Sequence, residues 1–411
     1  MARGRLVDVT DRGRTAEMLV DLVQLSHTTN LEALPRLVAE RTASVGLHDS
    51  AMFLVDLQDK VMREVTGRGL DAGEGGEEVR VDGTLPGRAW QRVESIAESG
   101  TRQGRRRWWT PITDGVERLG VLRTDVAEGE QPQQVLSEVA SVIALLLLSK
   151  RSFSDSYARL VRSAPMNVAA EMQTNLMPPP AYAGHNVTVG AVLEPAYDLG
   201  GDAFDFALAG TTLHLAVFDA MGHDTAAGIT ANVAVSACRN ARRQGASLAD
   251  ASRWVERTLM EQFGARRYVT GILADLDTTT GVLTWINRGH HLPLLIRDQR
   301  GSTTLTCPPA GPMGTGLGLP ITVCREQLQR GDRLVLYTDG VVEARDAEGN
   351  EFGRDRFVDF VLRHHSGHFT LHETLRRLMQ AVLDHHPGPM DDDATVLLAE
   401  WRGGDQDVLV P

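Results

Sequence analysis

The chain has 411 residues, of which 42% are hydrophobic, so we expect two or three packed domains and not a mainly disordered protein. Its formal net charge of -12 argues against general nucleic-acid binding, which needs a positive surface. The arginine-rich run at residues 102–107 is expected to be a solvated loop. No nucleic-acid partner is therefore predicted.

The first part of the chain alternates helical and strand-like patterns. We expect helices over residues 15–45, 85–90 and 132–162, and strands over residues 51–56, 61–65, 108–112 and 118–122. This order resembles a GAF sensor domain over residues 15–150, and the strongest local similarities lie in residues 85–90 and 111–122. A PAS-like α+β module is the alternative. The long helix that follows would transmit the signal and pair with its twin in a homodimer.

The second part of the chain is richer in strands. It opens with a helix over residues 166–177, which the prolines at 178–180 end. Strands are expected over residues 187–193, 213–218, 269–275, 282–286, 292–296, 333–337 and 394–400, and helices over residues 224–244, 248–263, 355–365 and 371–385. Many strands with paired helices predict an α+β fold in which two antiparallel sheets are stacked between helical layers.

The cysteines and the apolar runs bear on the compartment. Cys238, Cys307 and Cys324 are scattered without paired spacing, so neither a disulfide framework nor a zinc knuckle is expected, and a reducing cytosol fits. The N-terminus lacks the apolar segment of a signal peptide. The longest apolar run, residues 142–148, is far shorter than the ~20 residues that span a bilayer, and it predicts a buried or dimer-facing helix. We expect a soluble, cytoplasmic protein without a membrane span.

Four aspartates stand where an expected strand meets a loop, and they are Asp202, Asp219, Asp339 and Asp392. Any one of them alone is more simply explained as a turn residue. Their joint occurrence beside strands predicts a common site, where converging carboxylates repel each other unless a cation lies between them. Oxygen ligands suit Mg²⁺ or Mn²⁺. Two such ions roughly 3.5–4 Å apart acidify water and hold phosphoryl oxygens, so the pattern predicts a metal-dependent phosphate hydrolase.

Seven motifs in a fixed order carry a further resemblance. They are Glu171-Met-Gln-Thr-Asn-Leu-Met-Pro178, Leu199-Gly-Gly-Asp-Ala-Phe-Asp205, Phe218-Asp-Ala-Met-Gly-His223, Arg267-Tyr-Val-Thr270, Asn287-Arg-Gly-His290, Leu336-Tyr-Thr-Asp-Gly-Val-Val-Glu343 and Asp391-Asp-Asp-Ala-Thr395. With them, residues 167–401 resemble the SpoIIE-type branch of the PPM family, the metal-dependent serine/threonine phosphatases of protein phosphatase 2C type. The resemblance implies an α-β-β-α sandwich with two Mn²⁺ or Mg²⁺ ions at one end.

The two resemblances divide the chain into five regions. They are a flexible N-terminus (residues 1–14), a GAF-like sensor domain (15–150), a helical linker or switch region (132–177), a phosphatase domain (178–402) and a C-terminal tail (403–411).

Carried over position by position, the family resemblance gives each acid a role. Asp219 would bridge both ions, and the carbonyl of Ala220 would bind one of them. Asp339 and Asp392 would hold one ion, and Asp202 corresponds to a further acid on the metal side. Because three aspartates stand in a row, either neighbour could replace Asp392. The predicted catalytic residues are Asp202, Asp219, Asp339 and Asp392, and the predicted metal ligands are these four together with Ala220 and Asp393.

The chain also departs from the usual family pattern. The differences near the bridging acid are Phe218, Ala220, Met221 and Asp224, and His291 replaces the proline usual after Gly-His. None of these changes removes a ligand, although Asp224 adds a negative charge near the mouth of the site. His223 and His290 would contact the substrate or serve the structure, and Asp205 is expected to have a supporting role.

The resemblance implies a protein phosphatase whose sensor, responding to an unidentified small-molecule or protein signal, controls catalysis by moving the helices that precede the phosphatase domain. Its substrate would be a phosphorylated STAS-domain anti-anti-sigma factor of a bacterial partner-switching pathway. One alternative is a non-catalytic adaptor that binds this regulator, which the retention of all four acids opposes. Another is a nucleotide cyclase, suggested by Gly200-Gly-Asp202 but not by the Ala203-Phe204 that follows.

Overall fold

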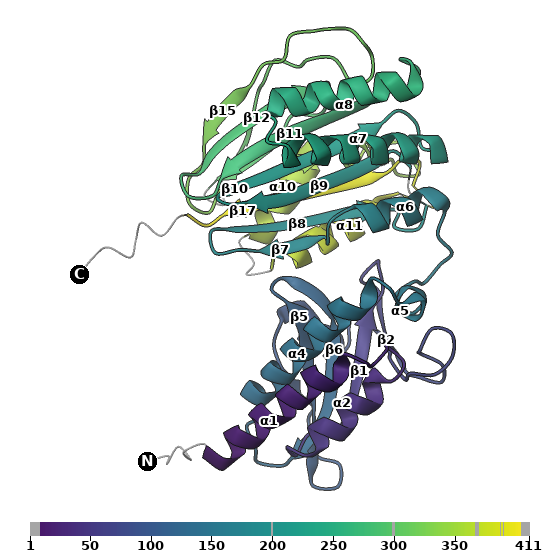
Figure 1. Ribbon diagram of the computed structural model, residues 1–411, viewed down its shortest axis with the longest axis vertical. Coiled ribbons are helices and arrows are strands. Elements are labelled where there is room, and N and C mark those ends of the chain that lie inside the picture. Colours follow the sequence, from purple (N-terminus) through teal and green to yellow (C-terminus); the bar gives the residue numbers. More distant parts are fainter. Residues whose placement is uncertain are drawn as a thin grey trace, which may run out of the picture. The chain divides into compact units, whose positions relative to one another are not determined.

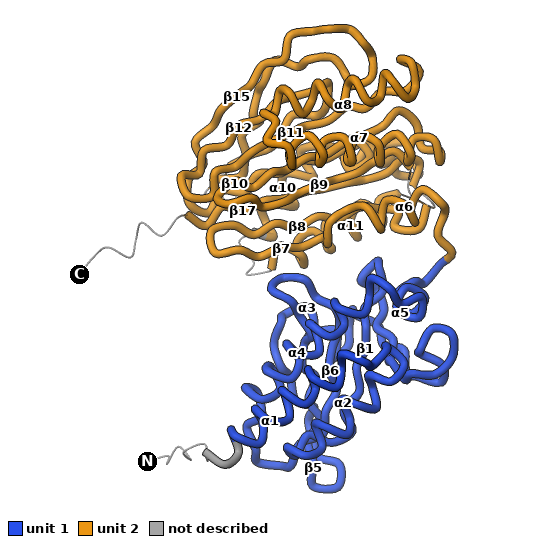
Figure 2. The backbone as a smooth tube through the Cα atoms, viewed as in Figure 1, with its two compact units in different colours: residues 1–164 blue, residues 165–411 orange. Residues whose placement is uncertain are grey.

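The computed structural model of the chain describes residues 9–198, 200–297, 301–365, 370–386, 388 and 390–403. The chain forms two compact units, Met1–Ala164 and Pro165–Pro411 (Figure 2). Both units combine helices with antiparallel sheets (Figure 1), which confirms the predicted α+β class. Residues 1–8 of the predicted flexible N-terminus and residues 404–411 of the predicted tail lie outside the described residues.

The first unit is built on one six-stranded sheet with the strand order β3-β2-β1-β6-β5-β4. Its elements are α1 (Val9–Ser26), α2 (Leu34–Ala43), β1 (His48–Val55), β2 (Val61–Glu64), β3 (Glu78–Arg80), α3 (Leu85–Arg92), β4 (Ile96–Ala97), β5 (Arg105–Asp114), β6 (Glu117–Ala127), α4 (Gln133–Arg151) and α5 (Asp155–Leu160). Because neighbouring residues of a strand point to opposite faces, Leu54 packs with α1, α2 and α4, whereas Phe53 packs with Trp90 of α3. The choice between a GAF-like and a PAS-like identity stays a prediction.

The helix predicted over residues 132–162 is shorter than expected. It ends at Arg151, and a separate helix, α5, begins after Ser154. The hydroxyl oxygen of Ser154 accepts a hydrogen bond from the backbone N–H of Tyr157, a capping role that serine fills better than a position inside a helix. The prediction of one continuous helix is therefore wrong beyond Arg151.

Helix α4 is also the one described helix whose length and composition would let it cross a membrane, and 44% of its apolar window is buried. Ile143, Leu146 and Leu147 pack into the core of the first unit, whereas Leu145 is 58% exposed. Most of the apolar run at residues 142–148 is therefore buried within the unit, which is one of the two roles predicted for it.

The second unit stacks two sheets between two helical layers (Figure 1), which confirms the predicted arrangement. Its elements are α6 (Val168–Leu176), β7 (Ala181–Ala183), β8 (Val187–Glu194), β9 (Asp202–Ala209), β10 (Thr212–Ala220), α7 (Thr225–Arg243), α8 (Leu248–Phe263), β11 (Val269–Asp277), β12 (Val282–Arg288), β13 (Leu294–Arg297), β14 (Gly301–Thr304), β15 (Cys324–Gln327), β16 (Arg333–Tyr337), α9 (Asp339–Glu343), α10 (Arg354–His365), α11 (Leu371–His385) and β17 (Ala394–Trp401).

The strand orders of these two sheets are β15-β12-β11-β10-β9 and β14-β13-β16-β17-β8-β7. Helices α7 and α8 pack on the first sheet, and α10 and α11 pack on the second. Side chains such as Val217 and Leu336 fill the space between the sheets. The end of β10 and the end of β16 therefore belong to facing sheets.

Strand β9 and the short strands β7, β14 and β15 are missing from the predicted set. The first four residues of β9, from Asp202 to Asp205, are all buried, so the strand shows none of the alternation that marks a half-buried strand. The glycines at 200 and 201 favoured a turn instead.

Cys307 and Cys324 form a disulfide bond with their Cα atoms 5.9 Å apart, contrary to the expectation of unpaired cysteines. Sequence spacing does not reveal this bond, because it depends on which segments the fold brings together. Cys324 lies opposite Trp285 on β12, and Trp285 and Cys307 belong to the same core cluster. Cys238 is free and buried in α7.

Candidate metal centre

The four predicted acids come from both sheets of the second unit. Asp202 begins β9, and Asp219 lies directly opposite it near the end of β10. Asp339 follows β16 at the start of α9, and Asp392 stands two residues before β17. The carboxylates of Asp339 and Asp392 both act on the pKa of Asp219, so these three side chains share one region.

Electrostatic repulsion is strong in this region. Burial, followed by the carboxylates of Asp339 and Asp392, raises the pKa of Asp219 to about 7. Burial and Asp339 also raise the pKa of Asp392. Carboxylates in such a cluster hold either protons or cations, because both relieve the repulsion. The oxygen donors present at Asp219, Asp339 and Asp392 therefore fit hard divalent ions.

Thr270 and His290 form a chain of polar contacts that ends at Asp219. The Oγ1 atom of Thr270 lies 2.8 Å from Nδ1 of His290 and 3.3 Å from Oδ2 of Asp219. Nε2 of His290 faces the carbonyl oxygen of Tyr337 at 3.1 Å, so it must carry the proton. Burial lowers the pKa of His290 to about 3, so the ring is neutral and Nδ1 accepts the only proton of the Thr270 hydroxyl. The contact of 3.3 Å from Thr270 to Oδ2 of Asp219 is the longer of the two, so the Asp219 carboxylate keeps lone pairs for a cation.

Asp202 has different surroundings from Asp219. Its Oδ2 atom accepts hydrogen bonds from the hydroxyls of Thr338, at 2.6 Å, and Thr395, at 2.7 Å. Burial, then the charges of Asp219 and Asp393, raises its pKa well above the usual value. The carboxylate thus joins β9 to the ends of β16 and β17, which suits a positioning role better than direct metal binding.

The three consecutive aspartates differ in their surroundings. Asp393 is buried, and its carboxylate accepts hydrogen bonds from the backbone N–H groups of Gly200, at 2.8 Å, and Asp202, at 3.1 Å. Asp391 and Asp392 are exposed, and Oδ1 of Asp392 accepts the N–H of Asp393. Within the described part of the chain, Oδ2 of Asp392 has no hydrogen bond. This arrangement favours Asp392 as the ligand and Asp393 as a support for the loop at residues 200–202.

Two glycines let backbone segments approach closely around the acids. A Cβ atom on Gly201 would lie 2.3 Å from the carbonyl oxygen of Ala220, and one on Gly340 would lie 2.1 Å from the carbonyl oxygen of Asp393. The Ala220 carbonyl is a predicted ligand, so Gly201 is part of the framework that positions it.

Two residues near the acids were given no role by the sequence. Arg267 donates to the carbonyl oxygen of Met221 and forms an ion pair of 3.4 Å with Asp224, which also caps α7. The negative charge expected from Asp224 is thus paired. Buried Gln173 of α6 donates to the carbonyl oxygens of Gly200, at 3.1 Å, and Asp202, at 2.7 Å. A single buried glutamine leaves no periodic signal that could have revealed it.

Asp205 has a structural role away from the acids. It is buried and forms ion pairs with Arg239 of α7, at 2.7 Å, and Arg242, at 2.8 Å. It therefore fastens β9 to the helix that covers its sheet.

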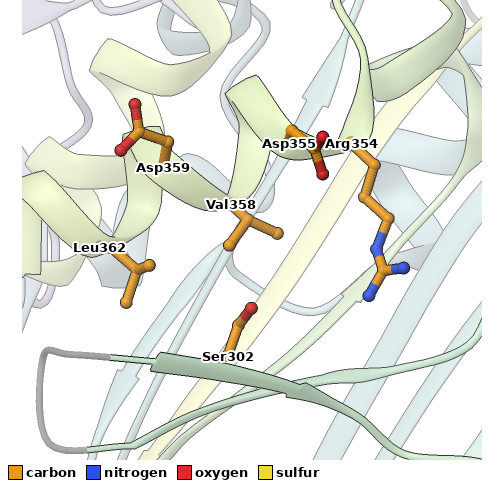
Figure 3. Close-up of a pocket in the computed structure, with 6 residues that line it drawn as sticks. All are labelled: Ser302, Arg354, Asp355, Val358, Asp359 and Leu362. Atoms are coloured by element: carbon orange, nitrogen blue, oxygen red, sulfur yellow. The ribbon is translucent and has the colours of Figure 1, made fainter.

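Described residues of the second unit line the two hollows considered next. One, of about 630 Å³, is lined by Asn287, Gly289, His290, Leu292, Thr306, Cys307, Pro308 and Pro309, and His290 in its wall contacts Thr270 beside Asp219. The other, of about 240 Å³, lies between β14 and α10 and is lined by Ser302, Arg354, Asp355, Val358, Asp359 and Leu362 (Figure 3). No predicted site acid lines either hollow, and only the first contacts a residue behind Asp219.

Comparison with known proteins identifies proteins similar to this chain. Residues 209–402 match the family model described as Stage II sporulation protein E (SpoIIE). Phosphoserine phosphatase RsbU of Bacillus subtilis is 22% identical over 185 residues, which cover 45% of this chain and 55% of RsbU. Protein IcfG of Synechocystis is 28% identical over 138 residues, 33% of this chain and 21% of IcfG. The chain therefore spans about half the length of the first relative and about a fifth of the second.

Among solved structures, the RsbU and RsbW domains of a Mycobacterium tuberculosis protein are 26% identical to this chain with a TM-score of 0.47. The match covers 53% of this chain and 62% of that chain.

Proposed function

Because residues 209–402 of this chain belong to the SpoIIE family of domains, we propose that the protein is a metal-dependent serine/threonine phosphoprotein phosphatase. The observation that carries the proposal is the convergence of Asp219 with Asp339 and Asp392, from segments of two facing sheets. The name of the relative RsbU, a phosphoserine phosphatase, supports the same reaction.

The acids would hold two Mn²⁺ or Mg²⁺ ions through Asp219, the carbonyl of Ala220, Asp339 and Asp392. When bound, the ions would neutralise phosphate charge and acidify water at neutral pH. The protein itself orients the donors, because Asp202 and Asp393 tie three segments together through buried hydrogen bonds. Short loops at strand ends hold ligands in place well because the sheets are rigid.

Arg267 would assist substrate binding. Its guanidinium contacts the Met221 carbonyl, two residues after Asp219, and its partner Asp224 is exposed, so the ion pair can open to a phosphate. Arginine suits phosphate because its planar N–H groups bind two oxygens at once.

The substrate is proposed to be a phosphorylated STAS-domain anti-anti-sigma factor in a bacterial partner-switching pathway in the cytoplasm. Dephosphorylation would let that regulator bind an anti-sigma kinase and release the sigma factor. Membership in the SpoIIE family and similarity to RsbU support this choice.

Residues 15–150 would be the GAF-like sensor and residues 132–177 the switch that controls the phosphatase domain at residues 178–402. Contacts of α6 support this coupling. Its capping residue Asn167 donates to Asp198 at 2.6 Å, and Gln173 holds the carbonyls of Gly200 and Asp202. A movement of α6 would therefore move the loop that Asp393 also holds.

A homodimer is proposed through the first unit. Apolar side chains remain exposed on α1 and α4, where Val20 is 53%, Val23 41% and Leu145 58% accessible. Polar substitutions at Val20 and Leu145 should leave a monomer in analytical ultracentrifugation; unchanged dimers would disprove this interface, and a monomeric parent would disprove the dimer.

The reaction is tested with Asp219→Asn in the full chain. The parent should hydrolyse an aryl phosphate and a phosphoserine peptide in Mn²⁺, and the variant should lose more than about 100-fold, since even residues that only support metal ligands are worth about 10–100-fold. Circular dichroism checks that the variant is folded.

The same experiment separates the alternatives. An inactive parent that binds the phosphorylated regulator would favour the adaptor. A cyclic product formed from GTP or ATP would favour the cyclase.

A further inference from the structure

A second group of ligand-type side chains adjoins the candidate metal centre. Ligand atoms of His291, Asp339 and Glu343 all lie within 4.8 Å of one another. His291 stands between β12 and β13, and Asp339 and Glu343 are one helical turn apart in α9. Asp339 also belongs to the candidate metal centre, whereas His291 and Glu343 do not.

The imidazole of His291 is held by aromatic neighbours. Its ring centroid lies 5.8 Å from that of Tyr337 and 6.0 Å from that of His290. Tyr337 is two residues before Asp339 and His290 donates to the Tyr337 carbonyl, so one backbone segment positions both the ring and the acid. The group is therefore arranged by the framework of the site and not by chance contact of long side chains.

Within the described ranges, the three side chains have no hydrogen-bond or ion-pair partner. Among the described residues, no hydrogen bond or ion pair reaches the His291 ring, the Asp339 carboxylate or the Glu343 carboxylate. Two carboxylates one turn apart on a helix repel each other. His291 and Glu343 are exposed, so a cation from solvent can reach all three.

We propose that His291, Asp339 and Glu343 form a further divalent-cation site that prefers Zn²⁺ and similar transition metals to Mg²⁺. Imidazole nitrogen is a good ligand for zinc, nickel and iron, whereas Mg²⁺ takes oxygen ligands in a strict octahedral geometry. In the candidate metal centre, Asp219 and Asp392 offer only oxygen ligands. The imidazole of His291 therefore gives the further site a different metal preference. The inference rests on the proposed function only because both use Asp339 as a metal ligand.

The test is calorimetric titration of the metal-free full chain with Zn²⁺ and, separately, with Mg²⁺. The variants are His291→Ala and Glu343→Gln, and His27→Ala is the matched control because it removes an exposed histidine from the first unit. We expect His291→Ala and Glu343→Gln to weaken one Zn²⁺ site by about 10-fold or more and His27→Ala to weaken none. We expect Mg²⁺ binding to be unchanged in His291→Ala.

Spectroscopy gives a second readout. Co²⁺ bound to the parent should show a visible spectrum that His291→Ala changes and His27→Ala does not. Equal Zn²⁺ binding in the parent and His291→Ala would overturn the proposal, and so would an equal loss of Mg²⁺ and Zn²⁺. Asp219→Asn should keep this Zn²⁺ site. Because neither experiment measures hydrolysis, failure of the proposed phosphatase activity would be a separate outcome.

Discussion

Asp202 and Asp219 are register partners on β9 and β10, yet two hydroxyls donate to Asp202, at 2.6 and 2.7 Å, whereas Asp219 has one longer contact of 3.3 Å with Thr270. Like charges directly opposite on neighbouring strands destabilise a sheet. The hydroxyls of Thr338 and Thr395 stabilise Asp202, and a cation would do the same for Asp219. The two partners would therefore have different roles, in which Asp202 positions the chain and Asp219 is the proposed metal ligand.

Removing one of these hydroxyls should destabilise the protein. Thr338→Val leaves Oδ2 of buried Asp202 with one donor fewer, and an unsatisfied buried polar group costs about 1–3 kcal/mol. Urea unfolding should show this loss, whereas Thr338→Ser keeps the hydroxyl and should unfold like the parent. Equal stability of Thr338→Val and the parent would mean that the contact contributes nothing.

The stability of the metal-free protein should depend on pH through Asp219. Its pKa is about 7 in the folded chain against 3.8 in the unfolded chain, so the folded state binds more protons between these values. This stabilisation is complete below pH 3.8 and is lost as the pH rises through 7, by at most about 1.4 kcal/mol per pH unit. Thermal unfolding in EDTA from pH 5 to 8 should show the decline.

Asp219→Asn is the control for that measurement, because it removes the titrating group. His290 acts in the opposite direction in both proteins, since its lowered pKa reduces stability as the pH falls below 6.5. The difference between parent and variant gives the contribution of Asp219 together with its effect on the neighbouring carboxyl of Asp202. Parallel curves for the two proteins would contradict the raised pKa.

Enlarging Gly201 should disturb the metal centre without touching an acid. A Cβ atom there would lie 2.3 Å from the Ala220 carbonyl oxygen, so Gly201→Ala must displace this predicted ligand. We expect Mn²⁺ affinity to fall by about 10-fold or more in calorimetry. Gly13→Ala, where a Cβ meets nothing within 4 Å, is the control. Unchanged affinity in Gly201→Ala would argue against the Ala220 carbonyl as a ligand.

Gln173 should couple α6 to catalysis. Gln173→Leu removes the hydrogen bonds to the carbonyls of Gly200 and Asp202, and we expect kcat for a phosphoserine peptide to fall by about 10-fold or more, because the loss changes how the site is held. Excess Mn²⁺ should restore part of the rate. Asn175→Ala, an exposed change in the same helix, should keep the parent rate. A normal kcat in Gln173→Leu would exclude this route of control.

Periodicity in the sequence determined much of the second unit. The helices predicted at residues 248–263 and 371–385 and the strand predicted at residues 333–337 have the observed bounds. The two helices each bury one face, and the strand is a short apolar run that is buried throughout. Both kinds of burial leave a local pattern of apolar residues in the sequence. The ordered motifs likewise predicted a SpoIIE-type domain, and residues 209–402 match that family model.

Tertiary structure alone decided how the site is assembled. The hydrogen bonds from Thr338 and Thr395 to Asp202 join residues 136 and 193 positions apart, and no local pattern records such pairs. The same holds for the bond between Cys307 and Cys324, and for the contacts that distinguish Asp393 from Asp392. Hydrogen bonds depend on where two distant segments meet, and only the packing of the two sheets brings those segments together.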